Sequence, residues 1–147
     1  MTSDATPTDT TRLTTLPDII VAAVAIIRDR RVLMVTARGR DVVFMPGGKV
    51  DAGETLVEAA QRESREEISV GLEPHTVREA FTVVTQAHGE PEGRMVRMTM
   101  FTGVPDAEPR PAAEVSALHW ISSAELHRCP PAGAEVVRRL AASGLID

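Results

Sequence analysis

Aromatic residues and cysteine are scarce in this sequence. It has no tyrosine, one tryptophan, three phenylalanines and one cysteine among 147 residues. The single cysteine, Cys129, excludes an internal disulfide and a zinc site built from several thiolates, and it suits a reducing cytoplasm. The most apolar window, Ile19–Ile27, falls well short of the ~20 residues that span a membrane, so we expect a cytoplasmic protein with no membrane partner.

Positively charged residues are fewer than negatively charged ones. Lys and Arg number 16 against 21 Asp and Glu, which gives a formal net charge of −5. This balance argues against binding to a nucleic acid polymer, whose phosphates require basic patches. An acidic chain can still bind a small phosphate compound when a divalent cation lies between the two.

Residues 1–15 are polar and rich in threonine, and they predict a flexible N-terminal tail rather than a signal peptide. Residues 16–147 fit a single domain with a core of its own. Strands and helices follow one another without strict alternation, which predicts an α/β (α+β) fold with a mixed sheet covered by helices. The expected strands are Asp18–Arg28, Arg31–Ala37, Val42–Met45, Glu79–Ala87, Arg94–Val104 and Ala117–Ile121.

Three helices are expected. The first begins at Thr55, where Glu58 completes a capping box, and runs to about Ile68 with Gly71 as its stop signal. The second follows the N-capping pair Ser122 and Ser123, and the third covers Ala132–Ala142.

The first of these helices has an unusual distribution of acidic residues. On a helical wheel its inward face carries three apolar residues and three glutamates: Leu56, Ala59, Ala60, Glu63, Glu66 and Glu67. Carboxylates at such spacing repel one another, and partial burial raises their pKa values unless a cation neutralises them. A cluster of hard oxygen ligands suits Mg²⁺ or Mn²⁺. From the wheel alone, an exposed acidic helix end held by salt bridges remains an alternative.

The preceding loop favours the metal site. Pro46, Gly47 and Gly48 allow a close approach of the backbone, and the loop then delivers Glu54 to the start of the helix. Together the loop and helix resemble the Nudix box of the MutT-related hydrolases, G-x5-E-x7-R-E-U-x-E-E-x-G-U, where U is a bulky aliphatic residue. The matching positions are Gly48, Glu54, Arg62, Glu63, Glu66, Glu67 and Val70.

Two positions depart from the box, because Ser64 replaces an aliphatic residue and Ser69 replaces the second glycine. Neither position holds a metal ligand in the family, so catalysis should survive both. Ser64 is expected to weaken the packing of the helix, and Ser69 to alter the geometry at its exit. The order of the flanking strands is also similar to the family across Asp18–Leu140.

The resemblance implies an α/β/α sandwich that hydrolyses a nucleoside diphosphate linked to another group, with Mg²⁺ or Mn²⁺. Glu66 and Glu67 correspond to the principal metal ligands, Glu63 to a further ligand or the general base, and the Gly48 backbone completes the site. Arg62 would orient a glutamate through a salt bridge. Glu114 resembles a late acidic residue that approaches the metal or acts as the base.

The chain outside the box sets the substrate. It lacks the tyrosine typical of dinucleoside polyphosphate hydrolases, and it lacks, near Thr85–Ala87, the proline typical of ADP-ribose hydrolases. These absences favour a nucleoside triphosphate, with ADP-ribose or a nucleotide sugar as the alternative, and a non-catalytic nucleotide-sensing module as another. A homodimer is possible by the same resemblance. The residues expected to contact the substrate are Phe44, Gly47, Gly48, Lys49, Gln86 and His88.

Overall fold

The structure is a computed structural model, and it describes residues 16–147. The tail predicted at residues 1–15 lies outside the described residues. The strands are β1 (Ile19–Ala25), β2 (Ile27–Arg28), β3 (Arg31–Ala37), β4 (Gly47–Lys49), β5 (Arg78–Gln86), β6 (Met95–Thr102) and β7 (Val115–Ile121). The helices are α2 (Leu56–Ile68), α3 (Pro131–Ala142) and two 3₁₀ segments, η1 (Pro74–Thr76) and η2 (Ser123–Arg128).

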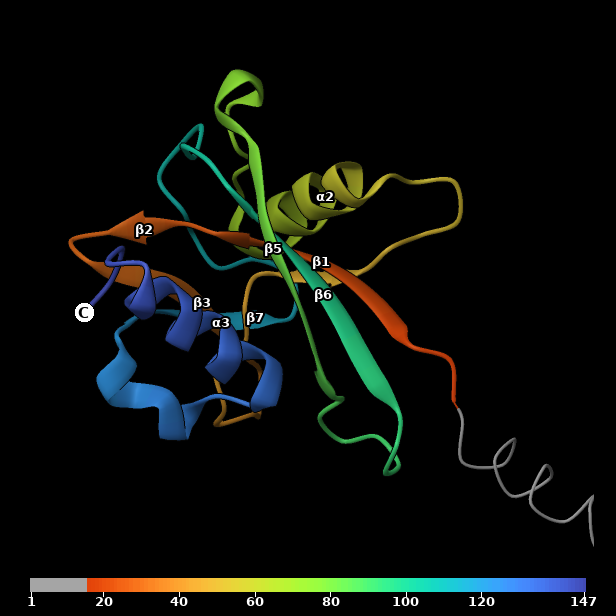
Figure 1. The fold of residues 1–147 in the computed structure, drawn as a ribbon. Helices are drawn as coiled ribbons and strands as arrows, with labels where there is room; N and C mark the ends of the chain where they lie inside the picture. The colour runs from red at the N-terminus through yellow and green to blue at the C-terminus, as the bar shows by residue number, and fades with distance from the viewer. Residues whose placement is uncertain (1–15) are drawn as a thin grey trace, which may run out of the picture.

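The strands form two sheets. One has the order β4-β1-β6-β5, in which β1 and β6 are parallel and the other neighbours are antiparallel. The other has the order β2-β3-β7 and is antiparallel throughout. The mixed sheet predicted from the sequence is therefore confirmed. Figure 1 shows β5 and β6 extending past their neighbours and joining in a hairpin at the bottom of the view.

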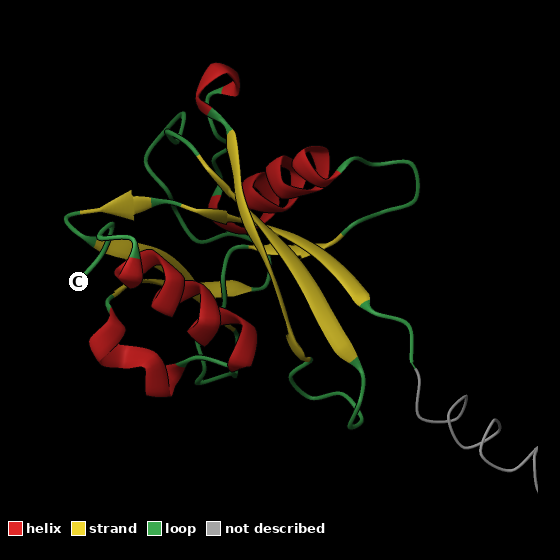
Figure 2. Cartoon of the chain, viewed as in Figure 1, coloured by secondary structure: helices red, strands yellow, loops and turns green. Residues whose placement is uncertain are grey.

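Helices α2 and α3 cover opposite faces of the strands, as the red helices on either side of the yellow strands show in Figure 2. The alternation of side chains along each strand produces this arrangement. In β1, Ala22 and Val24 belong to the apolar cluster beneath α2, whereas Ala23 and Ala25 belong to the cluster beneath α3. The predicted α/β/α layering is confirmed, with a separate apolar core on each side.

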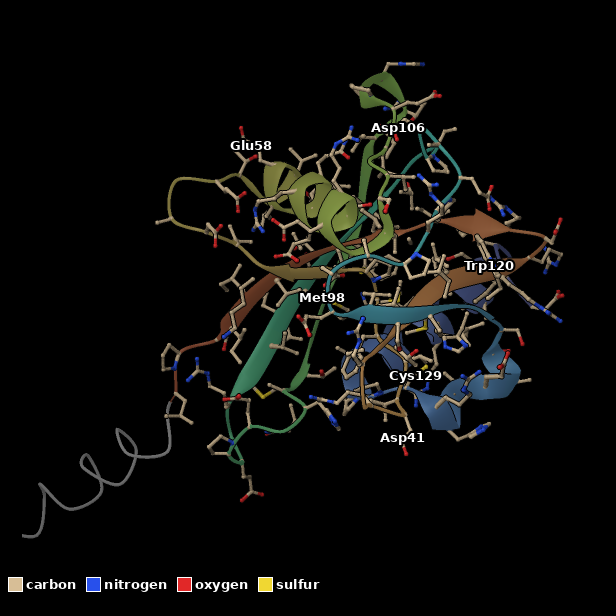
Figure 3. All side chains as sticks on the ribbon, turned by 180° about the vertical axis from the view of Figure 1, so that it is seen from behind. Asp41, Glu58, Met98, Asp106, Trp120 and Cys129 are labelled. Carbon is tan, nitrogen blue, oxygen red and sulfur yellow. The ribbon has the colours of Figure 1, made fainter. Side chains whose placement is uncertain are left out.

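The start of α2 agrees with the sequence prediction. The Thr55 hydroxyl accepts a hydrogen bond from the Glu58 backbone, and the Glu58 carboxylate accepts one from the Thr55 backbone, at 3.2 and 2.8 Å. This capping box is worth on the order of 1 kcal/mol and fixes the direction in which the loop enters the helix. Glu58 itself is exposed, and Figure 3 labels it at this end of α2.

Two local predictions were wrong. Residues 42–45 form no strand, and only a single bridge joins Phe44 to Val35, because the chain turns toward the short strand β4. The predicted strand at residues 18–28 divides into β1 and β2, which belong to different sheets. The predicted helix after Ser122 is present and is capped by Ser122, as a 3₁₀ helix with a kink at Glu125.

Helix α2 ends at Ile68, as predicted. Ser69 rather than Gly71 stops it, because Ser69 adopts the left-handed conformation, with φ of 65°. Within residues 16–147, no helix has the length and apolar character needed to cross a membrane.

Candidate active site

Arg62 holds the loop and helix of the predicted metal site together. Its guanidinium donates to both carboxylate oxygens of Glu54 at 2.7 and 2.9 Å, to Glu63 Oε1 at 2.8 Å and to the Lys49 carbonyl at 3.1 Å. Asp51 lies 3.4 Å away. Hydrogen bonds from Arg62 lower the pKa of Glu54 to about 2, so this carboxylate is ionised at neutral pH. The salt bridge predicted between Arg62 and a glutamate of the helix is present.

Glu67 joins the helix to the glycine pair. The Gly47 amide donates to Glu67 Oε1 at 2.9 Å. Burial raises the pKa of Glu67 to about 7, and the nearby carboxylates of Glu63 and Glu66 raise it further, against the effect of the Gly47 hydrogen bond. A cation bound at the Glu67 carboxylate would offset the free-energy cost of burying the negative charge.

Glycine is required at both positions of the pair by the lack of space. A Cβ on Gly47 would lie 2.4 Å from the Ala22 carbonyl oxygen. A Cβ on Gly48 would lie 2.6 Å from the Glu63 carboxylate. Each contact is shorter than side-chain atoms tolerate, so the glycines allow the backbone to lie directly against the strand and the carboxylate.

Glu66 differs from its neighbours in exposure. Its side chain is 55% exposed, against 16% for Glu63, and its carboxylate lies 3.6 Å from the Arg62 guanidinium. The site therefore presents one open carboxylate, Glu66, and two half-buried ones. All three come from one turn and a half of α2, as the wheel predicted.

A cavity of about 390 Å³ opens beside Glu67, between the ends of the two sheets and α3. Eight of the predicted residues contribute to its wall: Phe44, Gly47, Gly48, Lys49, Glu67, Gln86, His88 and Glu114. Arg62, Glu63 and Glu66 do not line it and form the adjoining cluster. The structure thus brings the predicted residues into two adjacent regions that share Glu67.

The remaining lining of the cavity is mainly apolar and was not predicted. Val21, Val96 and Met98 contribute from the strands, and Ala132 and Gly133 from α3. Figure 3 labels Met98 on β6, in the middle of the strands. Alternation along β1 and β6 marks these side chains as inward-facing, but it does not reveal that some of them border a cavity instead of the closed core.

A family comparison agrees with this geometry. The family model for the NUDIX domain matches residues 18–140. The chain belongs to the Nudix family. It is a hydrolase of this family, which acts on small nucleotide compounds and generally uses divalent metals.

Solved structures with the Nudix fold are similar over most of the chain. The E. coli ORF135 protein is 28% identical, with 87% of this chain and 94% of that chain covered and a TM-score of 0.63. A MutT protein from Methanosarcina mazei Go1 is 22% identical, with 87% and 96% covered and a TM-score of 0.68.

A bifunctional NMN adenylyltransferase/ADP ribose pyrophosphatase from Francisella tularensis, complexed with AMP and a Mn ion, is 18% identical. The comparison covers 96% of this chain and 47% of that one, with a TM-score of 0.65. Among curated proteins, no match was found.

The two serines that depart from the Nudix box have defined structural roles. Ser64 is fully buried, and its hydroxyl donates to the Val70 carbonyl, which satisfies an acceptor just beyond the helix. Ser69 takes the left-handed conformation that glycine adopts most easily, and its hydroxyl donates to the Arg110 carbonyl at 3.2 Å. Side-chain hydrogen bonds from these two serines therefore stabilise the path of the chain as it leaves the helix.

The donor set of the Nudix box fits a hard divalent cation in chemical type, since it consists of carboxylate oxygens around a backbone that glycine brings close. In residues 16–147, however, no three acidic, histidine or cysteine side chains converge tightly enough to enclose a metal ion. Glu63 points to Arg62 and Glu67 to the Gly47 amide. Both hydrogen bonds use the Oε1 oxygen, which leaves the Oε2 oxygen of each carboxylate for the ion.

Phe44, Lys49 and Glu114 line the cavity from different elements. Phe44 has the His88 ring at 6.0 Å, edge to face, and the Arg40 guanidinium at 5.5 Å from its centre. Glu114 is exposed at the start of β7, and Lys49 is exposed at the end of β4. Arg40 was not predicted, since a lone charge in a turn gives no sign that it will lie over an aromatic ring.

Proposed function

We propose that this chain hydrolyses a nucleoside triphosphate to the monophosphate and pyrophosphate, with Mg²⁺ or Mn²⁺ as its cofactor. The observation that carries the proposal is the position of Glu67, which belongs to the carboxylate cluster and also lines the 390 Å³ cavity. A ligand whose phosphates lie at the carboxylates would thus place its remaining part in a mostly apolar space. That combination matches a nucleotide.

Glu63, Glu66 and Glu67 would hold the divalent ion, together with the backbone of Gly48. An ion held there supplies positive charge that neutralises the phosphates and makes a water molecule more acidic. Ionised Glu54 and Arg62 would fix the position of Glu63 through the hydrogen bonds described above. Arg62 is thus a positioning residue in this proposal.

The reaction itself requires a base and a leaving group. Glu63 or Glu114 would accept the proton of the attacking water, whose oxygen forms a new bond to phosphorus. The phosphoanhydride P–O bond then breaks, and its electron pair leaves with the departing phosphate group. Lys49, at the edge of the cavity, would contact the phosphate oxygens.

The size of the cavity supports a single nucleoside. A volume of about 390 Å³ is near the lower end of the range of about 300–1,000 Å³ for small-molecule sites. A second nucleoside, as in a dinucleoside polyphosphate, would extend beyond it. Residues 16–147 offer no tyrosine to stack such a group.

The test is the release of pyrophosphate and phosphate from a panel of substrates with Mg²⁺ or Mn²⁺. The panel contains standard, oxidised and methylated nucleoside triphosphates, ADP-ribose, a nucleotide sugar and a dinucleoside tetraphosphate. We expect metal-dependent pyrophosphate release from a triphosphate, and its loss in Glu67→Gln. If ADP-ribose alone is cleaved, the alternative substrate is correct and the triphosphate is not. If no compound is turned over, the proposal that this chain is an active enzyme is contradicted.

A further inference from the structure

The side chain of Gln86 is occupied entirely by the hairpin that it precedes. Its amide nitrogen lies 3.3, 3.3 and 2.9 Å from the carbonyl oxygens of Ala87, Glu90 and Pro91. Its amide oxygen accepts from the Gly93 backbone at 2.9 Å. Gln86 therefore has no polar group left to contact a substrate directly, although it was predicted to do so.

Three backbone hydrogen bonds also hold the hairpin at residues 87–94. One closes its base, from Ala87 to the Arg94 carbonyl at 2.9 Å, and one closes each of its two turns, from Glu90 to the Ala87 carbonyl at 3.3 Å and from Arg94 to the Pro91 carbonyl at 3.0 Å. Gly89 and Gly93 have φ of 77° and 93°, a region that costs most residues energy but leaves glycine mobile. The Gln86 amide lies between the two turns and fixes both, as a small polar core.

This hairpin forms one wall of the cavity. His88 and Glu90 both line it, and the His88 ring contacts Phe44, which borders the glycine pair from the other side. The contact between His88 and Phe44 thus connects the hairpin to the loop that leads into the Nudix box. Because Phe44 and His88 both line the cavity, the position of the hairpin helps to set the shape of that cavity.

We propose that Gln86 is a positioning residue that sets the affinity for the nucleoside part of the substrate by holding this hairpin against the cavity. The inference rests on the proposed function of the site. The hairpin contributes none of the carboxylates proposed to hold the ion and, through it, the phosphates, so this wall would face the nucleoside. Loss of the amide leaves the carboxylate cluster on α2 unchanged, since the two share no contact.

The substitution Gln86→Met tests this, because methionine has nearly the same shape without the amide. We expect KM for the preferred nucleotide to rise about tenfold, because the substrate must then order the hairpin on binding. We expect kcat to stay within about twofold, and inhibition by pyrophosphate, which lacks a nucleoside, to be unchanged. Hydrogen exchange should accelerate at residues 87–94 in the protein without nucleotide.

Thr76→Val provides the matched control at the other end of β5 and β6. The Thr76 hydroxyl likewise bridges two backbone groups, donating to the Glu73 carbonyl at 2.6 Å and accepting from Val104 at 3.0 Å. Loss of this hydroxyl should loosen the segment around Thr76 and leave KM unchanged. The proposal would be overturned if KM were unchanged in Gln86→Met, or if kcat of that variant fell by as much as its KM rose. It would also be overturned if KM rose equally in Thr76→Val. Absence of turnover in the unsubstituted protein would instead contradict the proposed function, and faster exchange at residues 87–94 is measured independently of it.

Discussion

Gly48 lies so close to Glu63 that a Cβ atom at position 48 would stand 2.6 Å from the Glu63 carboxylate. The absence of a side chain at one residue therefore determines where the carboxylate of another can lie. The carboxylate, in turn, is fixed from the opposite side by the Arg62 guanidinium at 2.8 Å.

Gly48→Ala should displace Glu63 and lower kcat. A shift of about 1 Å at a reacting group can reduce turnover by about 100-fold, and we expect a loss of that order. The control is Gly144→Ala, where φ is 80° and the space is open, so stability should fall by about 1 kcal/mol while turnover is kept. Steady-state kinetics and thermal unfolding of both variants check this, and normal kcat in Gly48→Ala would contradict the assigned role of Glu63.

Arg62→Lys should reduce kcat by about tenfold with a smaller change in KM, because an ammonium group cannot donate to Glu54 and Glu63 at once as a guanidinium does. Arg65→Lys is the matched control on the same helix. Arg65 forms an exposed ion pair with Asp106 at 2.8 Å, in the loop labelled in Figure 3, and its replacement should leave kcat unchanged. Equal effects of the two substitutions would show that the loss is not specific to the network of Arg62.

His119 should make the stability of the protein depend on pH. Its Nδ1 lies 3.3 Å from the Arg128 guanidinium, which can only donate, so Nδ1 accepts and Nε2–H donates to the Thr36 hydroxyl at 3.1 Å. Burial lowers the pKa of His119, and the charge of Arg128 lowers it further, against the opposing charge of Glu125. The folded state therefore favours the neutral imidazole.

The sign of the effect follows from this lowered pKa. As the pH falls through about 6.5, the unfolded state takes up a proton at this histidine before the folded state does, so the free energy of unfolding decreases. Denaturation by urea at pH 8 and pH 5.5 should show this decrease, and His119→Gln should reduce it. His127→Gln, at an exposed histidine of η2, should leave it unchanged, and a decrease that persists in full in His119→Gln would exclude His119 as its source.

Ser69→Gly should stabilise the protein slightly. Serine with φ of 65° carries a backbone cost of about 1 kcal/mol that glycine lacks, and this exceeds the small loss of an exposed hydrogen bond to Arg110. Ser69→Ala keeps the cost and loses the hydrogen bond, so it should destabilise. Thermal unfolding distinguishes the two, and a destabilised Ser69→Gly would show that the hydrogen bond is worth more than the backbone strain.

Sequence reasoning succeeded where the interactions are local. The capping box of Thr55 and Glu58 and the glutamates of α2 follow from spacing within one helix, so the pattern determines them. The segment at residues 42–45 was predicted to be a strand, but the chain turns toward β4 there and pairs only through one bridge. No local sequence pattern indicates that turn. Trp120 packs against the core but is partly exposed, and the Arg28 guanidinium lies 4.7 Å from the centre of its ring, a contact that no local pattern predicts.

Gln86 illustrates a different limit. A polar residue at the end of a strand, near a predicted site, is typical of a substrate contact. Its actual partners are backbone groups within seven residues, and they become visible only once the two turns of the hairpin are known. The cavity could not be predicted from local patterns either, because the strands and α3 that surround it are distant in sequence.

The two faces of β1 have a consequence for how this enzyme can change. One face supports the helix with the glutamates, while the other continues, through Val21, into the wall of the cavity. Mutations at Val21 can therefore reshape the cavity without disturbing the packing of α2, because the two faces of the strand belong to different apolar clusters. The ligand preference of the cavity can thus change at this strand while the helix that carries the glutamates keeps its place.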